Sequence, residues 1–289
     1  MTCFYLVSEN MTFDKQVTWI SGMPRSGTTW LSQIFASSPD VRLKFCPLFS
    51  YEFKNKLDQN SNKADWLKLF KDVYNTESEY LDQDYLRKDG LVPSFINKKQ
   101  APEHLVIKST RFHQLLPNIL RLHSEIKFVH IVRHPCASLY SWLSNPYEFP
   151  SNADPKIEWR TGNCRKNEFG EFWGFIDWKW TTEQALKLEK LYRDRFKVIR
   201  YEDLMQSPKL FAQELFNFCG LKYEQSTEDF LMLSHSKHDE NKRSVFKSPD
   251  QILQWHEYLD SSIVSEILND IEGTELEQFS LKQIVQDIK

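Results

Sequence analysis

Residues 17–30 read V-T-W-I-S-G-M-P-R-S-G-T-T-W. Residues 17–21 are rich in β-branched and aromatic side chains, as is typical of a strand buried on both faces. A glycine-containing loop follows, and from Thr28 onward the pattern becomes helical. Glycines allow a tight turn and let backbone N–H groups approach an anion, and the N-terminus of the helix adds a partial positive charge. These residues therefore predict a strand, an anion-binding loop and a helix, in that order.

The loop has the glycine spacing of a Walker A motif but lacks its lysine. Gly22 and Gly27 occupy the two glycine positions, whereas Thr28 stands where the lysine would be. That lysine reaches the β- and γ-phosphates of a nucleoside triphosphate. Arg25 supplies a different cation earlier in the loop. We therefore expect a site for a phosphate-type anion without the usual triphosphate clamp; the alternative is a plain strand-turn-helix with Ser and Thr caps.

The rest of the chain alternates between strand and helix patterns. Runs rich in Val, Ile and aromatic residues recur at residues 104–108, 127–132 and 196–201. Helical patterns occupy residues 28–38, 114–123, 136–143, 172–194 and 210–219. This alternation predicts an α/β fold, with three α/β/α layers around a mainly parallel sheet. We expect one P-loop NTPase-like domain over residues 1–289, with a mostly helical insertion at about residues 48–100.

Composition argues against several functional classes. The 289 residues carry a formal net charge of −3, which disfavours a nucleic-acid binder. The five cysteines are scattered and lack C-x-x-C spacing, so we predict no disulfide framework, no zinc site and a reducing compartment. Residues 1–15 contain no long apolar run, which predicts neither a secretory signal nor a membrane anchor. The sequence thus predicts a cytoplasmic protein without metal, nucleic acid or membrane; its oligomeric state is left open.

Residues 24–30, P-R-S-G-T-T-W, resemble the 5′-phosphosulfate loop of the sulfotransferases that use 3′-phosphoadenosine-5′-phosphosulfate (PAPS). Soluble members of that family read P-K-S-G-T-T-W, and carbohydrate sulfotransferases of the same superfamily carry arginine in place of the lysine. The resemblance implies that Arg25 contacts the sulfuryl or bridging oxygens and that Trp30 stacks on the adenine. It implies that the 5′-phosphosulfate is gripped by Arg25, Ser26, Gly27, Thr28 and Thr29.

Residues 127–142, K-F-V-H-I-V-R-H-P-C-A-S-L-Y-S-W, resemble the family's 3′-phosphate motif. A strand pattern ends at Arg133, a proline opens the next helix, and Ser141 lies eight residues after Arg133. A guanidinium offers a planar fork to a phosphate. The resemblance therefore implies that Arg133 and Ser141 hold the 3′-phosphate of PAPS.

Two further segments resemble the family more loosely. Residues 198–204, V-I-R-Y-E-D-L, match a segment whose tyrosine contacts the adenine, which implies that role for Tyr201. Residues 242–247, K-R-S-V-F-K, are the nearest match to a basic cofactor-binding segment. From these we take Arg243 and Lys247 as cofactor-binding candidates; a solvated run of charges is the alternative.

The resemblance implies in-line transfer of the sulfuryl group of PAPS to a hydroxyl of a small-molecule or carbohydrate acceptor, without a metal. Such a reaction needs cations at the leaving group and a base at the acceptor. Soluble members read K-T-H after the second core strand, with the histidine as base. Here Lys108 matches the lysine and is taken as catalytic, but Thr110 occupies the histidine position. Glu52 is the first candidate for the base, followed by His113 and His104.

The sequence indicates the acceptor less clearly than the donor. The insertion at residues 48–100, which the resemblance implies lies on the acceptor side of a single sulfotransferase domain, carries aromatics such as Trp66, Tyr74 and Tyr80. It also carries the acidic residues Asp58, Asp65, Asp72, Glu77, Glu79, Asp82 and Asp84. Acidic and aromatic walls would suit a cationic or amphipathic acceptor, although solvated helix faces explain the same residues.

Two other functions remain open. The first is a small-molecule kinase with a degenerate P-loop, against which the absent lysine argues. The second is a non-catalytic protein that binds PAPS or another nucleotide, which the missing histidine keeps open.

Overall fold

Five strands form one sheet in the computed structural model, in the order β2-β3-β1-β4-β5. The structure describes residues 12–247 and 253–280. Every neighbouring pair of strands is parallel, so the predicted parallel sheet is confirmed. In chain order the strands are β1 (Gln16–Ser21), β2 (Val41–Phe45), β3 (His104–Ser109), β4 (Lys127–Val132) and β5 (Phe196–Arg200).

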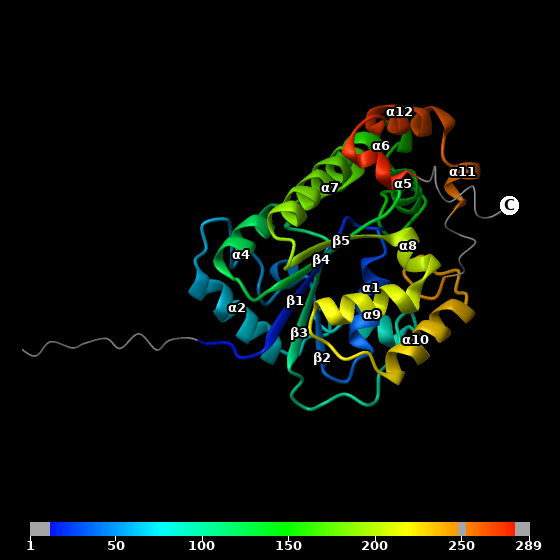
Figure 1. Ribbon diagram of the computed structural model, residues 1–289. Coiled ribbons are helices and arrows are strands. Elements are labelled where there is room, and N and C mark those ends of the chain that lie inside the picture. The colour runs from blue at the N-terminus through cyan, green and yellow to red at the C-terminus, as the bar shows by residue number, and fades with distance from the viewer. Residues whose placement is uncertain (1–11, 248–252, 281–289) are drawn as a thin grey trace, which may run out of the picture.

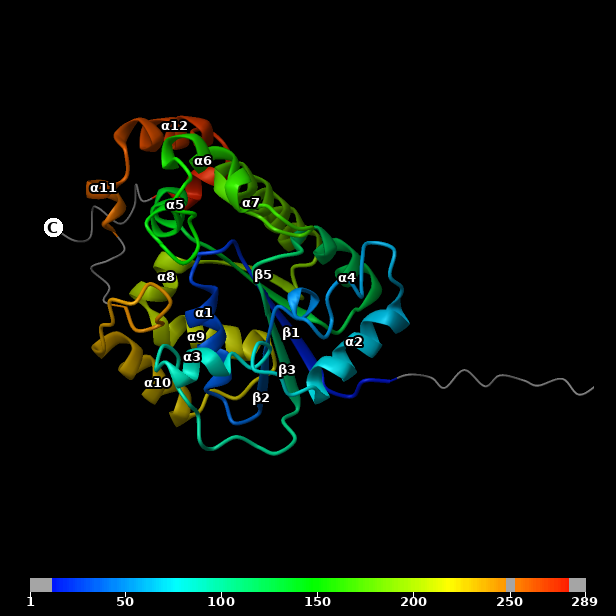
Figure 2. The same ribbon diagram turned by 180° about the vertical axis from the view of Figure 1, so that it is seen from behind.

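Helices cover both faces of the sheet, as Figures 1 and 2 show from opposite sides. One face carries α1 (Thr28–Ala36), α3 (Asp84–Lys88), α8 (Tyr201–Gln206), α9 (Pro208–Phe218) and α10 (Gln225–Ser236). The other carries α2 (Lys63–Asn75), α4 (Leu116–Leu122) and α7 (Gly174–Leu191). Toward the β5 side lie α5 (Pro135–Leu143), α6 (Pro155–Thr161), α11 (Trp255–Tyr258) and α12 (Ser261–Ile271). The predicted three-layer α/β/α fold of the P-loop NTPase-like type is therefore confirmed.

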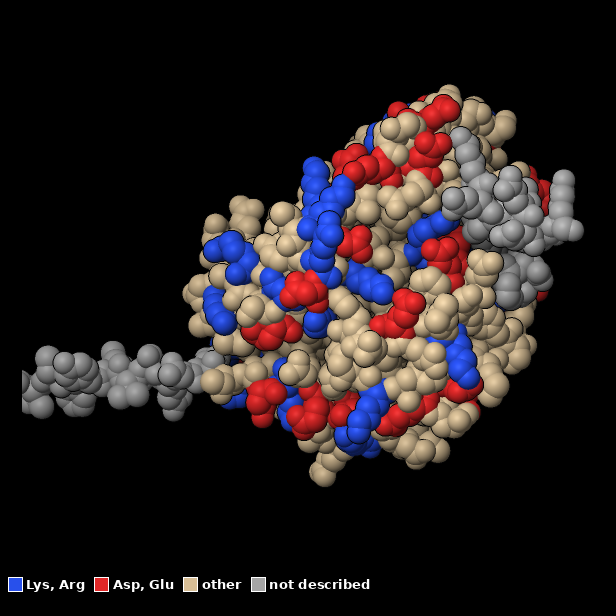
Figure 3. All heavy atoms as spheres, in the orientation of Figure 1, with Lys and Arg blue, Asp and Glu red and all other residues tan. Residues whose placement is uncertain are grey.

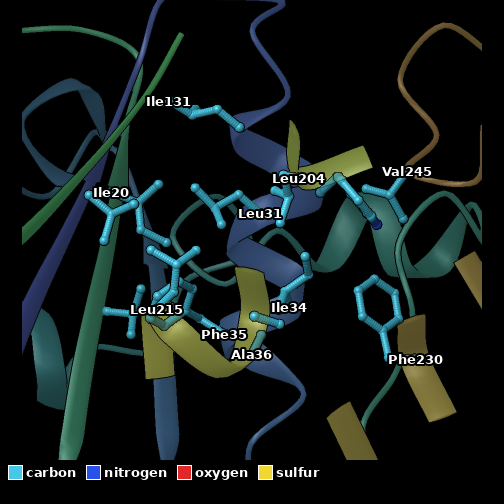
Figure 4. Packing of buried hydrophobic residues seen from close by; sticks show 14 of the residues in the cluster. Ile20, Leu31, Ile34, Phe35, Ala36, Ile131, Leu204, Leu215, Phe230 and Val245 are labelled. Carbon is cyan, nitrogen blue, oxygen red and sulfur yellow. The ribbon is translucent and has the colours of Figure 1, made fainter. Parts of the chain in front are cut away.

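Successive side chains of each strand enter two different apolar layers. Ile20 and Val129 pack with α1, α9 and α10 on one face, where Figure 4 shows Leu31 and Leu215 beside Ile20. Trp19 packs on the other face, with residues of α2, α4 and α7. Because consecutive strand residues point to opposite faces, a strand covered on both sides needs apolar side chains at nearly every position. The predicted strands therefore have nearly unbroken apolar runs because both of their faces are covered by helices.

The strand order places the carboxyl end of β1 at a switch point of the topology. β1 pairs with β3 on one side and with β4 on the other. In open parallel sheets, ligands bind outside the carboxyl ends of the strands at such a point, because the connecting loops diverge there. The loop between β1 and α1 and the loop between β4 and α5 both leave the sheet at this edge.

Two features differ from the sequence-based expectations. Strand β2 was not predicted, because Arg42 and Lys44 interrupt its apolar pattern; Lys44 is nevertheless buried and its Nζ pairs with Asp82 at 2.7 Å. The insertion at residues 48–100 is less helical than expected, since only α2, α3 and the 3-10 turn Pro47–Phe49 are helical there. Polar side chains in this insertion can hydrogen-bond to nearby backbone groups, and such bonds compete with those of a helix. The prediction for residues 1–15 falls largely outside the described residues.

Charges of both signs are interspersed on the face shown in Figure 3. In the part of the chain that the structure describes, no helix is long and apolar enough to cross a membrane.

Candidate active site

The loop between β1 and α1 is held in a shape that depends on two residues with positive φ. Arg25 has φ 68° and Gly27 has φ 94°. A Cβ at Gly27 would lie 2.3 Å from Cδ2 of Tyr201, so only glycine lets the first residue of α8 pack this closely on the loop. Arginine rarely adopts a left-handed conformation, and such strain concentrates at functional sites.

Ser26 stabilises the loop itself. Its hydroxyl donates to the carbonyl of Met23 at 2.7 Å, and its backbone N–H donates to the same carbonyl at 3.2 Å. Ser26 is buried and does not line the cavity that the neighbouring residues form. That Ser26 grips the donor stays a prediction, and in the structure both of its donors shape the turn.

A cavity opens at the N-terminus of α1. The first N–H groups of a helix have no partner within the helix and attract anions. Five residues that the sequence analysis singled out in the loop and helix line the cavity: Arg25, Gly27, Thr28, Thr29 and Trp30. We call it the donor cavity.

Arg133 and Ser141, far from the loop in sequence, reach the same cavity. The Nε of Arg25 donates to the Oγ of Ser141 at 3.1 Å, and an Nη of Arg133 donates to the carbonyl of Arg25 at 3.3 Å. The buried Nε of Arg133 has no hydrogen-bond partner among the described residues. A buried unused donor on a guanidinium is a feature that an anionic ligand would satisfy.

An aromatic wall faces these cations. The rings of Trp30 and Tyr201 meet edge to face at 6.2 Å, and the guanidinium of Arg133 lies 4.8 Å from the centre of the Tyr201 ring. The indole N–H of Trp30 donates to the Oγ of Ser234 at 3.1 Å, which fixes the indole orientation. An aromatic wall beside phosphate-binding groups is suited to a nucleotide base.

The basic segment at residues 242–247 also lines the donor cavity. Its carbonyl at Lys242 accepts a hydrogen bond of 2.7 Å from Arg25. Arg243 and Lys247 line the cavity as well, and burial lowers the pKa of Lys247 to about 8. From the sequence alone these two residues could belong to a solvated run of charges or could contact a ligand. In the structure both line the donor cavity.

A second cavity meets the donor cavity at the loop. Arg25, Thr28, Thr29 and Arg243 line both. Lys108 lines only the second, where its Nζ donates to the Oγ1 of Thr29 at 2.7 Å. Burial lowers the pKa of Lys108 to about 8. We call this the acceptor cavity, because it lies across the loop from the donor cavity.

None of the predicted bases lines the acceptor cavity. Glu52 lies outside it, and His113 is buried against the rings of His130 and Phe172, with its pKa lowered by burial to about 4. His104 begins β3 at the amino edge of the sheet, away from the loop. Part of the cavity wall comes instead from the loop that follows α5.

That loop supplies Glu148, which sequence reasoning missed. Among the described residues that line the acceptor cavity, Glu148 is the only carboxylate. Its Oε2 is buried without a hydrogen bond and lies 3.6 Å from the Nε of Arg25. Burial lowers the pKa of Arg25, and the negative charge of Glu148 opposes that shift. No sequence pattern marks a lone glutamate in a loop, so only the tertiary contact identifies it.

The acidic residues of the insertion do not form the wall that their number suggested. None of the seven lines the acceptor cavity. Asp72 pairs with Lys68 and Asp84 with Arg87, on the surface of their own helices. Asp65 completes the capping box of α2. Of the insertion aromatics named above, only Tyr80 lines the cavity, so the expectation of an acidic acceptor wall is wrong.

In residues 12–247 and 253–280, no group of three or more His, Cys, Asp or Glu side chains is arranged to hold a metal ion. The absence of a metal from the reaction stays a prediction.

Residues 18–225 match the sequence model of the sulfotransferase family. The chain is 24% identical over 215 residues to a Caenorhabditis briggsae protein named "Putative protein-tyrosine sulfotransferase", and the match covers 73% of this chain and 68% of that protein. It is 23% identical over 146 residues to carbohydrate sulfotransferase 3 of Mus musculus, covering 45% of this chain and 28% of that protein.

Solved structures share the fold at lower sequence identity. Mouse sulfotransferase SULT7A1, complexed with PAP, is 14% identical, with a TM-score of 0.53 over 95% of this chain and 90% of that one. A retinol dehydratase in a complex with retinol and PAP is 14% identical, with a TM-score of 0.53 over 92% of this chain and 84% of that one. At this identity the likeness concerns the fold, and the second name shows that the fold alone does not decide the reaction.

Proposed function

This chain belongs to the sulfotransferase family, and we propose that it transfers the sulfuryl group of PAPS to a hydroxyl of a small-molecule or sugar acceptor. One observation carries the proposal: two cavities meet at Arg25, Thr28 and Thr29 of the loop. An in-line transfer needs its donor and acceptor on opposite sides of the group that moves. The loop residues shared by both cavities would then hold the sulfuryl group between them.

The donor cavity offers partners for each part of PAPS. The N-terminus of α1 with Thr28 and Thr29 would receive the 5′-phosphosulfate, and Arg133 with Ser141 the 3′-phosphate. The unused buried Nε of Arg133 supports the second assignment. Trp30 and Tyr201 form the aromatic wall for adenine, and Arg243 and Lys247 add positive charge for the two phosphate groups.

In the reaction, a bond forms between the acceptor oxygen and sulfur as the bond between sulfur and the bridging phosphate oxygen breaks. Negative charge grows on the 5′-phosphate of the leaving 3′-phosphoadenosine-5′-phosphate. Arg25 and Lys108, which line the acceptor cavity beside the loop, would stabilise that charge. The proton of the acceptor hydroxyl must leave in the same step, and it needs a base on the acceptor side.

We assign the base to Glu148. It is the carboxylate of the acceptor cavity, and its Oε2 has no hydrogen bond that would compete for the proton. Its contact with Arg25, 3.6 Å from Oε2 to Nε, holds it beside the cation that faces the sulfuryl group. This assignment replaces Glu52 and His113, which lie outside the cavity.

The small-molecule or sugar acceptor and a cytoplasmic compartment are also part of the proposal. The four described cysteines have free thiols, which supports a reducing environment.

The donor assignment is tested by calorimetric titration with 3′-phosphoadenosine-5′-phosphate, compared with ADP and with ATP and Mg²⁺. We expect preference for the 3′-phosphorylated ligand without metal. Arg133→Ala should weaken binding of 3′-phosphoadenosine-5′-phosphate about a hundredfold, because charge-assisted bonds to one phosphate are lost. It should leave binding of adenosine 5′-phosphosulfate unchanged, because that ligand has no 3′-phosphate. Arg121→Ala, in the exposed surface of α4, is the matched control.

Equal loss for both ligands in Arg133→Ala would refute the 3′-phosphate assignment. Preference for ATP with Mg²⁺ would replace the proposal by the kinase alternative. Tight binding of the 3′-phosphorylated ligand without turnover on a broad panel of phenols, alcohols and sugars would favour the non-catalytic alternative.

A further inference from the structure

The walls of the acceptor cavity are aromatic and cationic. Its aromatic residues come from separate segments of the chain: Phe45, Phe49, Tyr80, Tyr85, Tyr147 and Trp173. Its cations are Arg25, Lys108, Arg111, Arg165 and Arg243, against the single carboxylate of Glu148. Aromatic walls favour a flat apolar body, and an excess of partly desolvated cations favours a ligand with negative charge.

Most of these cations already have a partner or a role at the donor. Arg25 and Lys108 face the sulfuryl group under the proposed function, and Arg243 also lines the donor cavity. Arg111 forms a buried ion pair with Glu171. Arg165 is the exception, because no carboxylate pairs with it within residues 12–247 and 253–280, and its Nε is buried without a hydrogen bond.

The surroundings make an unpaired arginine at this position unusual. The adjacent Lys166 pairs with Asp177 at 2.7 Å, and Arg160 in the preceding helix pairs with both Glu266 and Asp270. Carboxylates are therefore close by in the same region, yet they are used by other cations. An unsatisfied buried donor costs free energy unless a ligand or water supplies the acceptor.

Tight backbone packing holds Arg165 at the cavity. Arg165 ends the 3-10 turn Asn163–Arg165, which begins directly after Gly162. Gly162 has φ 65°, and a Cβ there would lie 2.6 Å from the backbone of Trp173. The guanidinium of Arg165 lies 5.8 Å from the centre of the Trp173 ring. The backbone conformation at Gly162, which only glycine permits, thus holds the Arg165 guanidinium next to the Trp173 ring.

We propose that the acceptor is a small aromatic hydroxyl compound that carries an anionic group, and that Arg165 binds that group. This inference rests on the proposed function, since it concerns the acceptor of the same transfer. A carboxylate, a sulfonate and a phosphate offer the guanidinium the same chemistry. Glu148, the one negative group in the cavity, is engaged by Arg25 and faces the hydroxyl end of the acceptor.

The test measures binding of phenols by calorimetry to the full chain saturated with 3′-phosphoadenosine-5′-phosphate. The probes are para-substituted phenols that differ in charge: 4-hydroxyphenylacetate and 4-hydroxybenzenesulfonate are anionic, 4-hydroxyphenethyl alcohol is neutral and tyramine is cationic. We expect the anionic phenols to bind about tenfold to a hundredfold more tightly than the neutral one, with tyramine weakest. The carboxylate and sulfonate arms distinguish which anion fits.

Arg165→Gln should abolish the preference for anionic phenols, whereas Arg121→Gln should keep it. Arg165→Lys should retain part of it, which keeps the test decisive if the glutamine variant fails to fold. Equal binding of neutral and anionic phenols, no binding of any phenol, or a preference that survives Arg165→Gln would each overturn the inference. Because nucleotide binding is measured first, its absence would instead mean that the proposed function is wrong.

Discussion

Replacing Lys108 by methionine should make the protein more stable while removing its activity. Lys108 is 3% exposed, and burial lowers its pKa from an ordinary 10.5 to about 8. A cation in the folded state at pH 7 therefore costs about 3 kcal/mol relative to the unfolded chain. Methionine fills a similar volume without charge but forfeits the hydrogen bond to Thr29, which is worth about 1 kcal/mol. We expect a net gain of about 2 kcal/mol at pH 7.

The sign of the pH dependence follows from the direction of the shift. The folded-state pKa of Lys108 is lower than that of the unfolded chain, so the unfolded chain binds more protons between pH 8 and pH 10.5. The cost of the charge is complete below pH 8 and disappears as the pH rises through that range. The advantage of Lys108→Met should therefore shrink to about 0.5 kcal/mol at pH 9.5.

Urea denaturation of wild type and Lys108→Met at pH 7 and pH 9.5 measures both quantities. Lys187→Met, an exposed position on α7, serves as the control and should show a small change that does not depend on pH. A variant less stable than wild type at pH 7, or a stability difference independent of pH, would refute the account of a buried, destabilising cation. A buried charge retained at such a cost is consistent with a role in catalysis.

Two further substitutions test the site. Glu148→Gln should lower turnover about a hundredfold or more while leaving affinity for 3′-phosphoadenosine-5′-phosphate unchanged; full turnover with phenols that do not ionise near neutral pH would contradict its role as base. Gly27→Ala should reduce the free energy of unfolding by more than about 1 kcal/mol, because strain adds to a 2.3 Å contact with Tyr201. Gly220→Ala, at φ 72° with nothing within 4 Å, isolates the strain alone in urea denaturation, and equal losses would show that the Tyr201 contact does not matter.

The donor side of this protein could be predicted because its features are local. A buried strand, a glycine turn and a helix start lie within residues 17–30, and backbone geometry alone turns such a segment into an anion site. Arg133 lies at the end of a second buried strand, and parallel strands bring their carboxyl ends to one edge of the sheet. The order of apolar runs predicted four of the five strands, and the resemblance to the sulfotransferase motifs singled out Arg25 and Arg133.

The acceptor side depended on contacts that no local pattern encodes. Glu148 lies in a loop and Arg165 ends a three-residue 3-10 turn, and in such short segments no hydrophobic period marks a position. Glu52 was a candidate only because it follows the first helix closely in the sequence. In the structure it does not line the acceptor cavity. By itself the sequence determined four of the five strands and the loop that follows β1, since short-range backbone rules create them. Only the tertiary structure decided which carboxylate and which cations line the acceptor cavity, because long-range packing of loops selects among many similar side chains.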